Sequence, residues 1–367
     1  MVNDPMVNVL AIIGASYLQL PVVERAKEMG LRTICFAWPQ GAVCKEVCDR
    51  FYPVSITEKE EILRICREEQ ITGICTIGSD VAAPTVAYVA QQMGLPGNAY
   101  DAAVRAHDKK LMQQILIDAG VDCPKTIDQL STLNSPYLQI VPLGKELSTL
   151  NFPLIVKPTD RSGSLGVQKV EREEDLQPAI DLAKSLSIAG EAIVEEYIEG
   201  REISVEMISQ NGVHHPLQIT DKTTTGAPHF VELAHHQPST LPSQIQERIF
   251  AITRRALDAL GLTNGASHSE YKITADGRIV VMEIAGRMGG DFIGSDLVQL
   301  STGYDFLRGV IEVAIGLPIH VEVQQRAQSS VVFEAPENLT CSADRTGYII
   351  YRNNEIYKQS VGRSADL

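Results

Sequence analysis

The sequence predicts an α/β protein in which an N-terminal parallel sheet is followed by a mixed α+β region. Over the first hundred residues, short apolar runs alternate with amphipathic stretches, which is typical of strands and helices that build a parallel sheet. Beyond residue 151 the apolar runs instead resemble antiparallel strands around a Gly-rich turn. The chain has 367 residues, and at roughly 100–200 residues per domain this length indicates two or three domains.

The individual elements follow from the apolar periodicity. The expected strands of the N-terminal sheet are 7–13, 32–37 and 71–77, and the expected helices there are 21–29, 57–69 and 81–93. A helical pattern continues over 101–120, and the polar stretch 128–151 is expected to be irregular. Further on, we expect strands within 152–206 around a helix at 173–186, helices at 243–260 and 304–315, and strands in the C-terminal segment.

The net charge argues against anionic partners. The chain has 46 acidic and 32 basic residues, a formal net charge of −14, so nucleic acid and anionic membranes would meet general repulsion. We therefore expect neither as a partner, and an anionic substrate requires a locally positive site. The N-terminus lacks the basic leader of a signal peptide and its apolar run is too short to span a bilayer, so we expect a cytoplasmic protein with reduced cysteines.

Several common catalytic motifs are incomplete. A dinucleotide fingerprint belongs after the first strand, but Ser16 and Gln19 replace its second and third glycines. The sequence contains no Walker-type Gly-x-x-x-x-Gly-Lys-Ser/Thr motif. The hydrolase nucleophile elbow is nearly matched at 162–166, yet Ser162 stands where its first glycine belongs. A nicotinamide oxidoreductase and a hydrolase are therefore disfavoured.

A histidine-rich stretch lies between Pro228 and Pro238. His229, Glu232 and His235 suggest a metal cluster, but in an extended strand Glu232 is expected to point away from both histidines. We therefore prefer to interpret these residues as parts of a substrate loop or as surface histidines.

The most informative segment is 265–283, in which Asp276-Gly277 is a strong signal for a two-residue hairpin turn. Counting outward from that turn places Glu270 directly opposite Glu283. The other face of the hairpin is then wholly apolar and must be buried, which supports this register over a one-residue slip. The residues of this apolar face are Tyr271, Ile273, Val280 and Met282.

Two opposed glutamates indicate a metal site or a solvated surface. Directly opposed side chains stand about 4.5–5.5 Å apart at Cβ, and like charges at this separation repel. A divalent cation between them would reverse that interaction, and carboxylate oxygens suit Mg²⁺, which is commonly shared with substrate phosphates. The alternative is a solvated face on which Glu270 and Glu283 happen to align, shielded by Lys272. From the hairpin alone, both interpretations stay open.

A second segment offers groups for phosphates. Residues 152–158 predict a buried strand that carries Lys157 near its end, and a Gly/Ser-rich loop follows over 159–167. Backbone N–H groups of such a loop can bind phosphate oxygens, and Lys157 adds a point charge. The alternative is an ordinary hairpin loop. A dense set of carboxylates follows between 195 and 206, on two further expected strands.

Taken together, these segments resemble the ATP-grasp superfamily over about the whole chain, and within it the carboxylate–amine ligase and carbamoyl-phosphate-synthetase-like branch, including L-amino-acid ligases. The matched pieces come in the family's order: 105–110 with 119–124, Val156-Lys157-Pro158, the Gly-rich loop, Glu195 to Ile198 with Gly200 and Glu202, and Glu270 and Glu283 to Arg287. The resemblance implies a parallel α/β pre-ATP-grasp domain over 1–104 and a two-lobed α+β ATP-grasp domain over 105–319. Its small lobe would span about 121–196, and a C-terminal β segment over 320–367 would complete it.

The resemblance also implies roles for single residues. It implies contacts to ATP from Lys109, Lys157, Ser164, Gly166, Glu195, Glu196, Tyr197, Ile198 and Glu202. It implies that Glu270 and Glu283 bind Mg²⁺, with Mn²⁺ as an alternative ion, and that Arg287 and Lys157 stabilise the transferred phosphoryl group. It implies contacts to the substrates from Lys222, Glu232, His235, Arg287, Gly289 and Gly290.

The implied activity is that of a ligase, which activates a small carboxylate as an acyl phosphate and couples it to an amine, releasing ADP and phosphate. The implied partners are these small molecules, and a homodimer would fit the family. One departure is Ala285, because the family commonly reads Glu-x-Asn-x-Arg there and the asparagine often completes the metal shell. A bicarbonate-activating enzyme of the same superfamily and a non-catalytic ATP-binding protein remain as alternatives.

Overall fold

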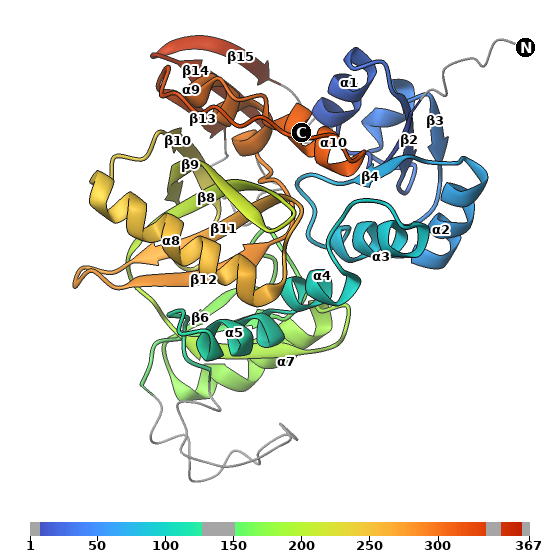
Figure 1. Ribbon diagram of the computed structural model, residues 1–367. Helices are drawn as coiled ribbons and strands as arrows, with labels where there is room; N and C mark the ends of the chain where they lie inside the picture. The colour runs from blue at the N-terminus through green and yellow to red at the C-terminus, as the bar shows by residue number, and fades with distance from the viewer. Residues whose placement is uncertain (1–7, 127–150, 335–345, 362–367) are drawn as a thin grey trace, which may run out of the picture.

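The computed structural model describes residues 8–126, 151–334 and 346–361, which form three sheets with helices packed around them (Figure 1). The stretch expected to be irregular, 128–151, lies outside the described residues except for its last residue. Figure 1 shows the N-terminal sheet beside the largest sheet, with the smallest sheet and the last strands at opposite ends of the molecule.

Parallel strands form the N-terminal sheet, in the order β3-β2-β1-β4, which confirms the predicted parallel α/β architecture. Its strands are β1 (Val9–Ile13), β2 (Arg32–Phe36), β3 (Arg50–Tyr52) and β4 (Gly73–Cys75). Its helices are α1 (Leu20–Glu28), the 3₁₀ turn η1 (Val43–Glu46), α2 (Lys59–Glu68) and α3 (Ala83–Met93). The sequence analysis does not predict β3, because its residues are exposed or half-buried and lack the apolar run that marks the other strands of this sheet.

The helix expected over 101–120 is divided into α4 (Tyr100–His107) and α5 (Lys109–Asp118). Asp108 leaves the helical conformation, and its carboxylate accepts the N–H groups of Lys110 and Leu111, which caps α5. The break therefore fixes Lys109 as the first residue of α5, where its side chain is buried.

The smallest sheet is antiparallel in the order β6-β5-β7 and is covered by α7, which agrees with the strands and helix expected over 152–196. Its elements are β5 (Leu154–Pro158), β6 (Gln168–Val170), the 3₁₀ turn η3 (Glu173–Asp175), α7 (Leu176–Leu186) and β7 (Ala192–Glu196). Leu154 and Val156 of β5 pack with Leu176 and Ala183 of α7 in one apolar cluster. The alternate residue Lys157 is thereby left on the face turned from α7.

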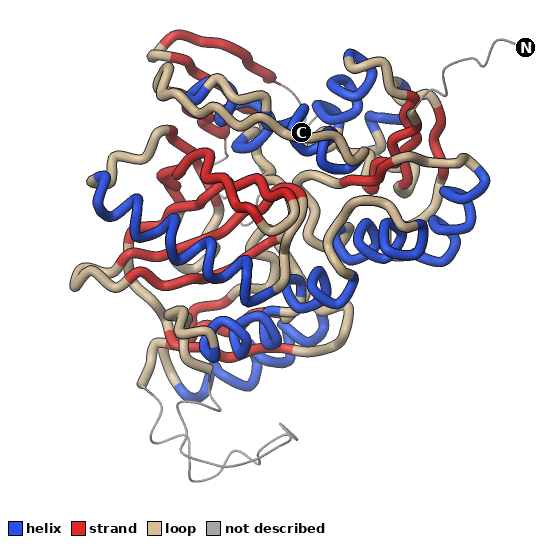
Figure 2. The backbone as a smooth tube through the Cα atoms, in the orientation of Figure 1, coloured by secondary structure: helices blue, strands red, loops and turns tan. Residues whose placement is uncertain are grey.

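The largest sheet has the order β12-β11-β8-β9-β10-β13-β14-β15. Its strands are β8 (Arg201–Gln210), β9 (Val213–Thr224), β10 (Glu232–Gln237), β11 (Gly265–Ile273), β12 (Ile279–Ala285), β13 (Ser329–Glu334), β14 (Gly347–Arg352) and β15 (Glu355–Val361). The helices of this part are α8 (Ser243–Leu260), the π-helix η4 (Ile293–Leu297), α9 (Val298–Thr302) and α10 (Phe306–Ala314). Figure 2 shows α8 running along the sheet. The helix expected over 243–260 is confirmed, and the strands expected near the C-terminus join this sheet.

The β11–β12 hairpin pairs Glu270 with Glu283 as predicted, although the turn between the strands is wider than expected. Ile273 pairs with Ile279 instead of Val280, so the register next to the turn differs by one residue from the prediction. A β-bulge between Glu270 and Tyr271 then restores the predicted register at the two glutamates.

The bulge changes which side chains form the buried face of this hairpin. Tyr271, Ile279 and Val281 belong to the apolar core beneath the sheet, so the predicted membership of Val280 and Met282 in that face is wrong. Met282 instead lines the cleft that is described below. The prediction was wrong because it assumed a two-residue turn and strand pairing without a bulge.

The N-terminal sheet contacts the rest of the molecule at the carboxyl end of β4. Ile77 forms a parallel β-bridge with Met288, and the N–H of Gly78 donates to the carbonyl of Met288 at 3.1 Å. Leu10 of β1 and Val310 of α10 lie in the same apolar cluster. The loop after β4 is thus fixed against the segment that follows Glu283.

The remaining expectations concern domains, cysteines and membranes. The boundary expected after residue 104 falls inside α4, and the one after 319 lies between α10 and β13; the division into domains stays a prediction. The cysteines of the described residues carry free thiols, while Cys341 lies outside them. Within the described ranges, none of the helices has both the length and the apolar character that a transmembrane helix needs.

Candidate active site

One cleft between the smallest and the largest sheet collects residues from distant parts of the chain. The predicted site residues that line it are Lys109, Lys157, Ser164, Glu195, Glu202, Lys222, Glu232, Glu270, Glu283 and Arg287. Asp80, from the loop after β4, and His268 also line it, although the sequence did not single them out. The predicted residues that are not part of this lining are Gly166, Glu196, Tyr197, Ile198, His235, Gly289 and Gly290.

Each of the two paired glutamates forms an ion pair with a lysine. Lys222 Nζ lies 2.9 Å from Oε1 of Glu270, and Lys109 Nζ lies 3.0 Å from Oε1 of Glu283. Burial would raise the pKa of Glu270, but the charge of Lys222 and the hydrogen bond from His268 hold it well below its usual value. The carboxylates are thus shielded by Lys222 and Lys109, and not by Lys272 as the alternative interpretation expected.

The carboxylate oxygens of Glu270 and Glu283 are suitable ligands for a hard divalent cation. The hydrogen bonds from Lys222 and His268 both reach Oε1 of Glu270, and that from Lys109 reaches Oε1 of Glu283. The second oxygen of each carboxylate takes no part in these bonds, and both glutamates face one cleft. Oxygen donors of this kind suit Mg²⁺. Ala285, which pairs with His268 across the hairpin, adds no donor oxygen.

Lys157 is nearly buried and is held by two residues behind it. Its Nζ lies 2.6 Å from Oε1 of Glu195, whose other oxygen accepts Nε2 of Gln113 at 2.6 Å. Glu195 itself is completely buried. The expected contact of Glu195 with ATP therefore competes with its contacts to Lys157 and Gln113, which position Lys157 at the cleft.

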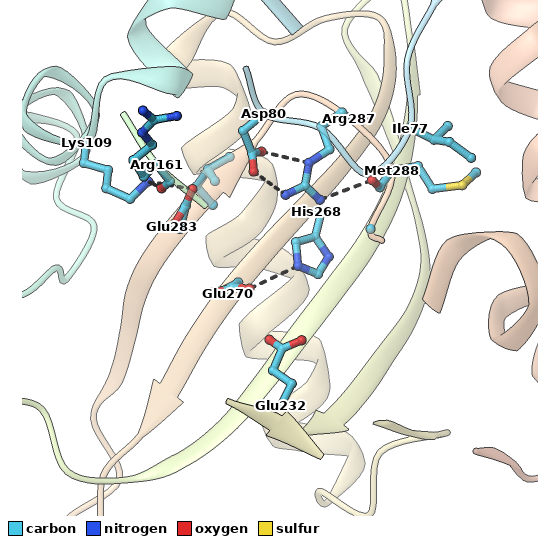
Figure 3. A network of polar contacts seen from close by, with 12 residues as sticks. Ile77, Asp80, Lys109, Arg161, Glu232, His268, Glu270, Glu283, Arg287 and Met288 are labelled. Carbon is cyan, nitrogen blue, oxygen red and sulfur yellow. Dashed lines mark hydrogen bonds and ion pairs between the residues drawn. The ribbon is translucent and has the colours of Figure 1, made fainter. Parts of the chain in front are cut away.

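The Gly-rich loop after β5 adopts backbone conformations that favour glycine. Gly163, Ser164 and Gly166 have φ values of 65°, 59° and 77°. Ser164 Oγ donates to the carbonyl of Phe230 at 3.1 Å, and Lys109 Nζ donates to the carbonyl of Arg161 at 2.8 Å (Figure 3). The loop is therefore tied to both sides of the cleft.

Of the ATP contacts expected between residues 196 and 202, only Glu202 lines the cleft. Glu202 lines the cleft and pairs with Lys272 at 3.1 Å. The ring of Tyr197 lies under Lys169, 4.4 Å from its Nζ. Glu196 pairs with Arg278 at 3.1 Å. The side chain of Glu196 therefore serves an ion pair outside the cleft.

The histidine-rich stretch, which includes β10, contributes Glu232 to the same cleft as Glu270. His235 Nε2 lies 3.2 Å from Oε2 of Glu232, and these two residues and Asp291 offer ligand atoms within 4.8 Å of one another. The expectation that Glu232 points away from His235 is therefore wrong. The reason is a β-bulge between Glu232 and Ala234, which shifts the alternation of β10. His229 is exposed.

Lys222 is central to this group, because it contacts both Glu232 and Glu270. Burial would raise the pKa of Glu232, but the charge of Lys222 lowers it to about 2. Burial would lower the pKa of His235, but the charge of Glu232 raises it above its usual value. This end of the cleft thus carries ionised groups of both signs.

Arg287 is held by the N-terminal sheet. Its Nε and Nη2 donate to the two oxygens of Asp80 at 2.8 and 2.7 Å, and its Nη1 donates to the carbonyl of Met288 at 3.2 Å (Figure 3). A guanidinium has five N–H groups. These three bonds therefore leave two donors for an anion in the cleft. Burial would raise the pKa of Asp80, but the charge of Arg287 lowers it.

His268 bridges two carboxylates at the edge of the cleft. Its Nδ1 forms a short hydrogen bond with Glu206, and its Nε2 lies 3.3 Å from Oε1 of Glu270. Burial alone would lower the pKa of His268, but the charge of Glu206 raises it to about 9. The other oxygen of Glu206 accepts the N–H of Gly289 at 3.0 Å, a group that was expected to face a substrate.

The sequence contained signals for two of the residues that it did not identify. Asp80 follows a parallel strand, and the carboxyl ends of such strands are where open α/β sheets bind ligands. His268 lies two residues before Glu270 on one strand, so their side chains share a face. Glu206 had no such signal, because only the pairing of β8 with β11 places it opposite His268.

Comparison with known proteins finds a likeness for the region that contributes most of this cleft. A family model described as the ATP-grasp domain matches residues 150–296, which include Lys157, Glu270, Glu283 and Arg287. Alanine–anticapsin ligase of Bacillus subtilis (strain 168) is 27% identical over 275 residues, covering 66% of this chain and 56% of that protein. The chain thus spans little more than half the length of this protein and of two further alanine–anticapsin ligases that it matches.

Solved structures show the same fold. The crystal structure of L-amino acid ligase from Bacillus licheniformis has a TM-score of 0.73 and 23% sequence identity, covering 91% of this chain and 82% of that one. Phosphoribosylglycinamide synthetase from Anaerococcus prevotii has a TM-score of 0.72 and 21% identity, covering 90% of this chain and 82% of that one. These likenesses establish the arrangement of the sheets.

Proposed function

We propose that this chain, whose residues 150–296 match the ATP-grasp family model, is an ATP-dependent ligase that joins a small carboxylate to an amine. The observation that supports this most directly is the single cleft in which Lys157 and Arg287 face the opposed carboxylates of Glu270 and Glu283. The curated relative that ligates alanine to anticapsin supports an amino acid as one of the two substrates.

The physical problem of such a reaction is to bring a carboxylate against the triphosphate. We propose that Glu270 and Glu283 hold Mg²⁺, or Mn²⁺ in its place, which would neutralise phosphate charge. Lys157 and Lys109 add fixed positive charge to the cleft, and the two remaining N–H donors of Arg287 face the oxygens of the transferred group. Phosphoryl transfer needs mainly such positioning and charge stabilisation, so no nucleophilic side chain is required.

The acceptor end supports an amine as the second substrate. Glu232 is ionised and lies with His235 beside Lys222, so its carboxylate offers an acceptor for an ammonium group. Arg287 offers the complementary site for a carboxylate. The roles of Ser164, Gly166, Glu196, Tyr197, Ile198, Glu202, Gly289 and Gly290 stay predictions. A cytoplasmic location and a homodimer also remain proposals that follow from the family.

The test is a screen of amino acids and small carboxylates, singly and in pairs, with Mg·ATP and a phosphate-release assay. Turnover that needs one acid and one amine is expected. With the acid labelled by ¹⁸O in its carboxylate, one labelled oxygen should appear in phosphate, because an acyl phosphate transfers that oxygen. Turnover with bicarbonate alone would favour the bicarbonate-activating alternative, and nucleotide binding without any turnover would favour the non-catalytic one.

Glu283→Gln is expected to abolish this turnover, because the amide removes one of the two charges opposed across the hairpin. Far-UV circular dichroism should stay close to that of the wild type, although loss of the charge that pairs with the buried Lys109 is expected to lower the melting temperature. Glu247→Gln on the exposed side of α8 is the control and should leave turnover unchanged. Full activity of Glu283→Gln would contradict the proposed metal role.

A further inference from the structure

The starting observation is a buried ion pair beside the proposed metal ligands. Glu206 of β8 and His268 of β11 are direct cross-strand partners, and their side chains are 0% and 6% exposed. Nδ1 of His268 is bonded to Oε1 of Glu206, and Nε2 lies 3.3 Å from Oε1 of Glu270. Since both neighbours are carboxylates, which accept hydrogen bonds when ionised, the imidazole is placed to donate from both nitrogens.

The second oxygen of Glu206 reaches a different part of the site. Its Oε2 accepts the N–H of Gly289 at 3.0 Å, in the segment that begins with Arg287. The contact is so close that an added side chain would displace the carboxylate or the imidazole: a Cβ on Gly289 would lie 2.6 Å from Oε1 of Glu206 and 2.8 Å from Nδ1 of His268. The buried carboxylate of Glu206 therefore contacts both His268, which bonds to Glu270, and the backbone next to Arg287.

We propose that Glu206 is a positioning residue that fixes two parts of the active site at once. Through His268 it orients the carboxylate of Glu270, and through the N–H of Gly289 it sets the segment that carries Arg287. The inference rests on the proposed function, since it assigns Glu270 to the metal and Arg287 to the transferred group. Glu206 itself does not line the cleft and touches neither.

A second buried histidine on the same sheet provides the comparison, although its carboxylate partner Asp258 belongs to α8 and is 69% exposed. His214 of β9 lies 3.1 Å from Asp258 and 2.7 Å from Ser209, and it is 8% exposed. None of these three residues lines the cleft. Loss of His214 should therefore affect stability alone, whereas a residue that orients a metal ligand should also affect the metal.

The experiment measures the binding of ADP with Mn²⁺ by calorimetry, which requires neither the acid nor the amine. Glu206→Gln keeps the size of the side chain but places an amide donor against either His268 or the N–H of Gly289. We expect it to weaken Mn²⁺-dependent ADP binding about 10- to 100-fold, the usual effect of losing a residue that orients a metal ligand. His268→Asn should weaken it similarly, and His214→Asn should leave it unchanged.

The second readout is hydrogen exchange of the amide of Gly289, followed by mass spectrometry of a peptide that covers it. Glu206→Gln should speed this exchange, whereas His268→Asn should change it much less, because the bond to Gly289 comes from Glu206. A merely structural role would not produce this split between the two variants. If Glu206→Gln does not fold, Gly289→Ala disturbs the same carboxylate from the other side and should weaken Mn²⁺-dependent ADP binding equally.

The outcomes separate this inference from the proposed function. Wild-type affinity for ADP with Mn²⁺ and an unchanged Gly289 amide in Glu206→Gln would overturn the positioning role while leaving the ligase proposal intact. A wild-type protein that binds no ADP in the presence of Mn²⁺ would overturn the proposed function and this inference with it.

Discussion

Cys48 shows how the surroundings of a single residue set its reactivity. Its thiol is half-buried at the end of the turn that follows η1. The hydrogen bond with the thiol of Cys35 lowers the pKa of Cys48 to about 7, although burial opposes this shift. Burial raises the pKa of Cys66 and of Cys75 to about 12.

We expect iodoacetamide to alkylate Cys48 before any other described cysteine. The thiolate is the reactive form, so a lowered pKa moves its appearance to lower pH, and the rate should rise with pH to half its maximum near pH 7. Peptide mass spectrometry of briefly treated native protein measures this. Equal labelling of Cys66 or Cys75 in the native protein would contradict the prediction.

Single residues of the site were predictable where a local pattern carried them. Glu270 and Glu283 follow from one turn signal, and Lys157 follows from its place at the end of a buried strand. The wide turn shifts the pairing of the hairpin by one residue from the prediction, and the bulge shifts it back by one. The prediction is therefore correct at the glutamates, which lie beyond the bulge, and wrong for Met282, which lies at the bulge. Glu206 could not be identified, since its meaning depends on a strand that lies 62 residues away along the chain.

At the level of elements, the cap of α5 links local structure to the site. Asp108 accepts the N–H groups of Lys110 and Leu111 at 2.9 and 3.0 Å, and Lys109 reaches Glu283 from the first turn. Asp108→Ala should cost about 1 kcal/mol of stability. It should also weaken ADP binding, because the first turn that positions Lys109 frays. Chemical denaturation and calorimetry measure the two effects.

A second helix cap provides the control for this prediction. Asp305 caps α10 by accepting the N–H of Arg308 at 3.0 Å, and it does not line the cleft. Asp305→Ala should lose a similar amount of stability and keep wild-type ADP affinity. Equal affinities in both variants would show that the cap of α5 has no influence on the site.

The break between α4 and α5 explains why boundaries were harder to predict than helices. The apolar pattern continues through 101–120, so periodicity alone gives one helix. Asp108 is a strong N-cap residue, and its side-chain bonds outweigh the continuing pattern. Similarly, the bulge in β10 has no marker in the sequence, and it decides whether Glu232 meets His235.

At the scale of the whole molecule, one buried ion pair joins the loop after the N-terminal sheet to the cleft. The side chains of Asp80 and Arg287 are 9% and 10% exposed and lie 2.7 Å apart. Breaking such a pair leaves a buried charge without its partner, which costs about 3–5 kcal/mol. We expect Asp80→Asn to be strongly destabilised and to lower kcat more than it raises the KM for ATP, as steady-state kinetics would reveal.

Asp101→Asn is the control at this scale. Asp101 pairs with Arg105 at 2.9 Å, but its side chain is 71% exposed, and a surface pair of this kind is worth about 0.3–0.5 kcal/mol. Its stability and kinetics should match the wild type closely. A loss in Asp80→Asn as small as that in Asp101→Asn would show that Asp80 does not support Arg287.

The overall architecture was predictable because strand–helix alternation and the ordered motifs extend along most of the chain. The parallel sheet and the antiparallel lobes follow from these patterns. The order of strands in the largest sheet does not, since β10 pairs with β13, and Ala234 lies opposite Val332 far along the chain. Periodicity identifies strands, but it carries no information about partners this distant.

This distant pairing has a consequence for synthesis on the ribosome. The strands of the N-terminal sheet all lie within residues 9–75, so that sheet can assemble while most of the polypeptide has not yet been translated. The edge of β10 that pairs with β13 stays unpaired until residue 334, the last residue of β13, has left the exit tunnel. During this interval the nascent chain exposes an unpaired strand edge, which is the kind of surface that chaperones cover and that self-association exploits.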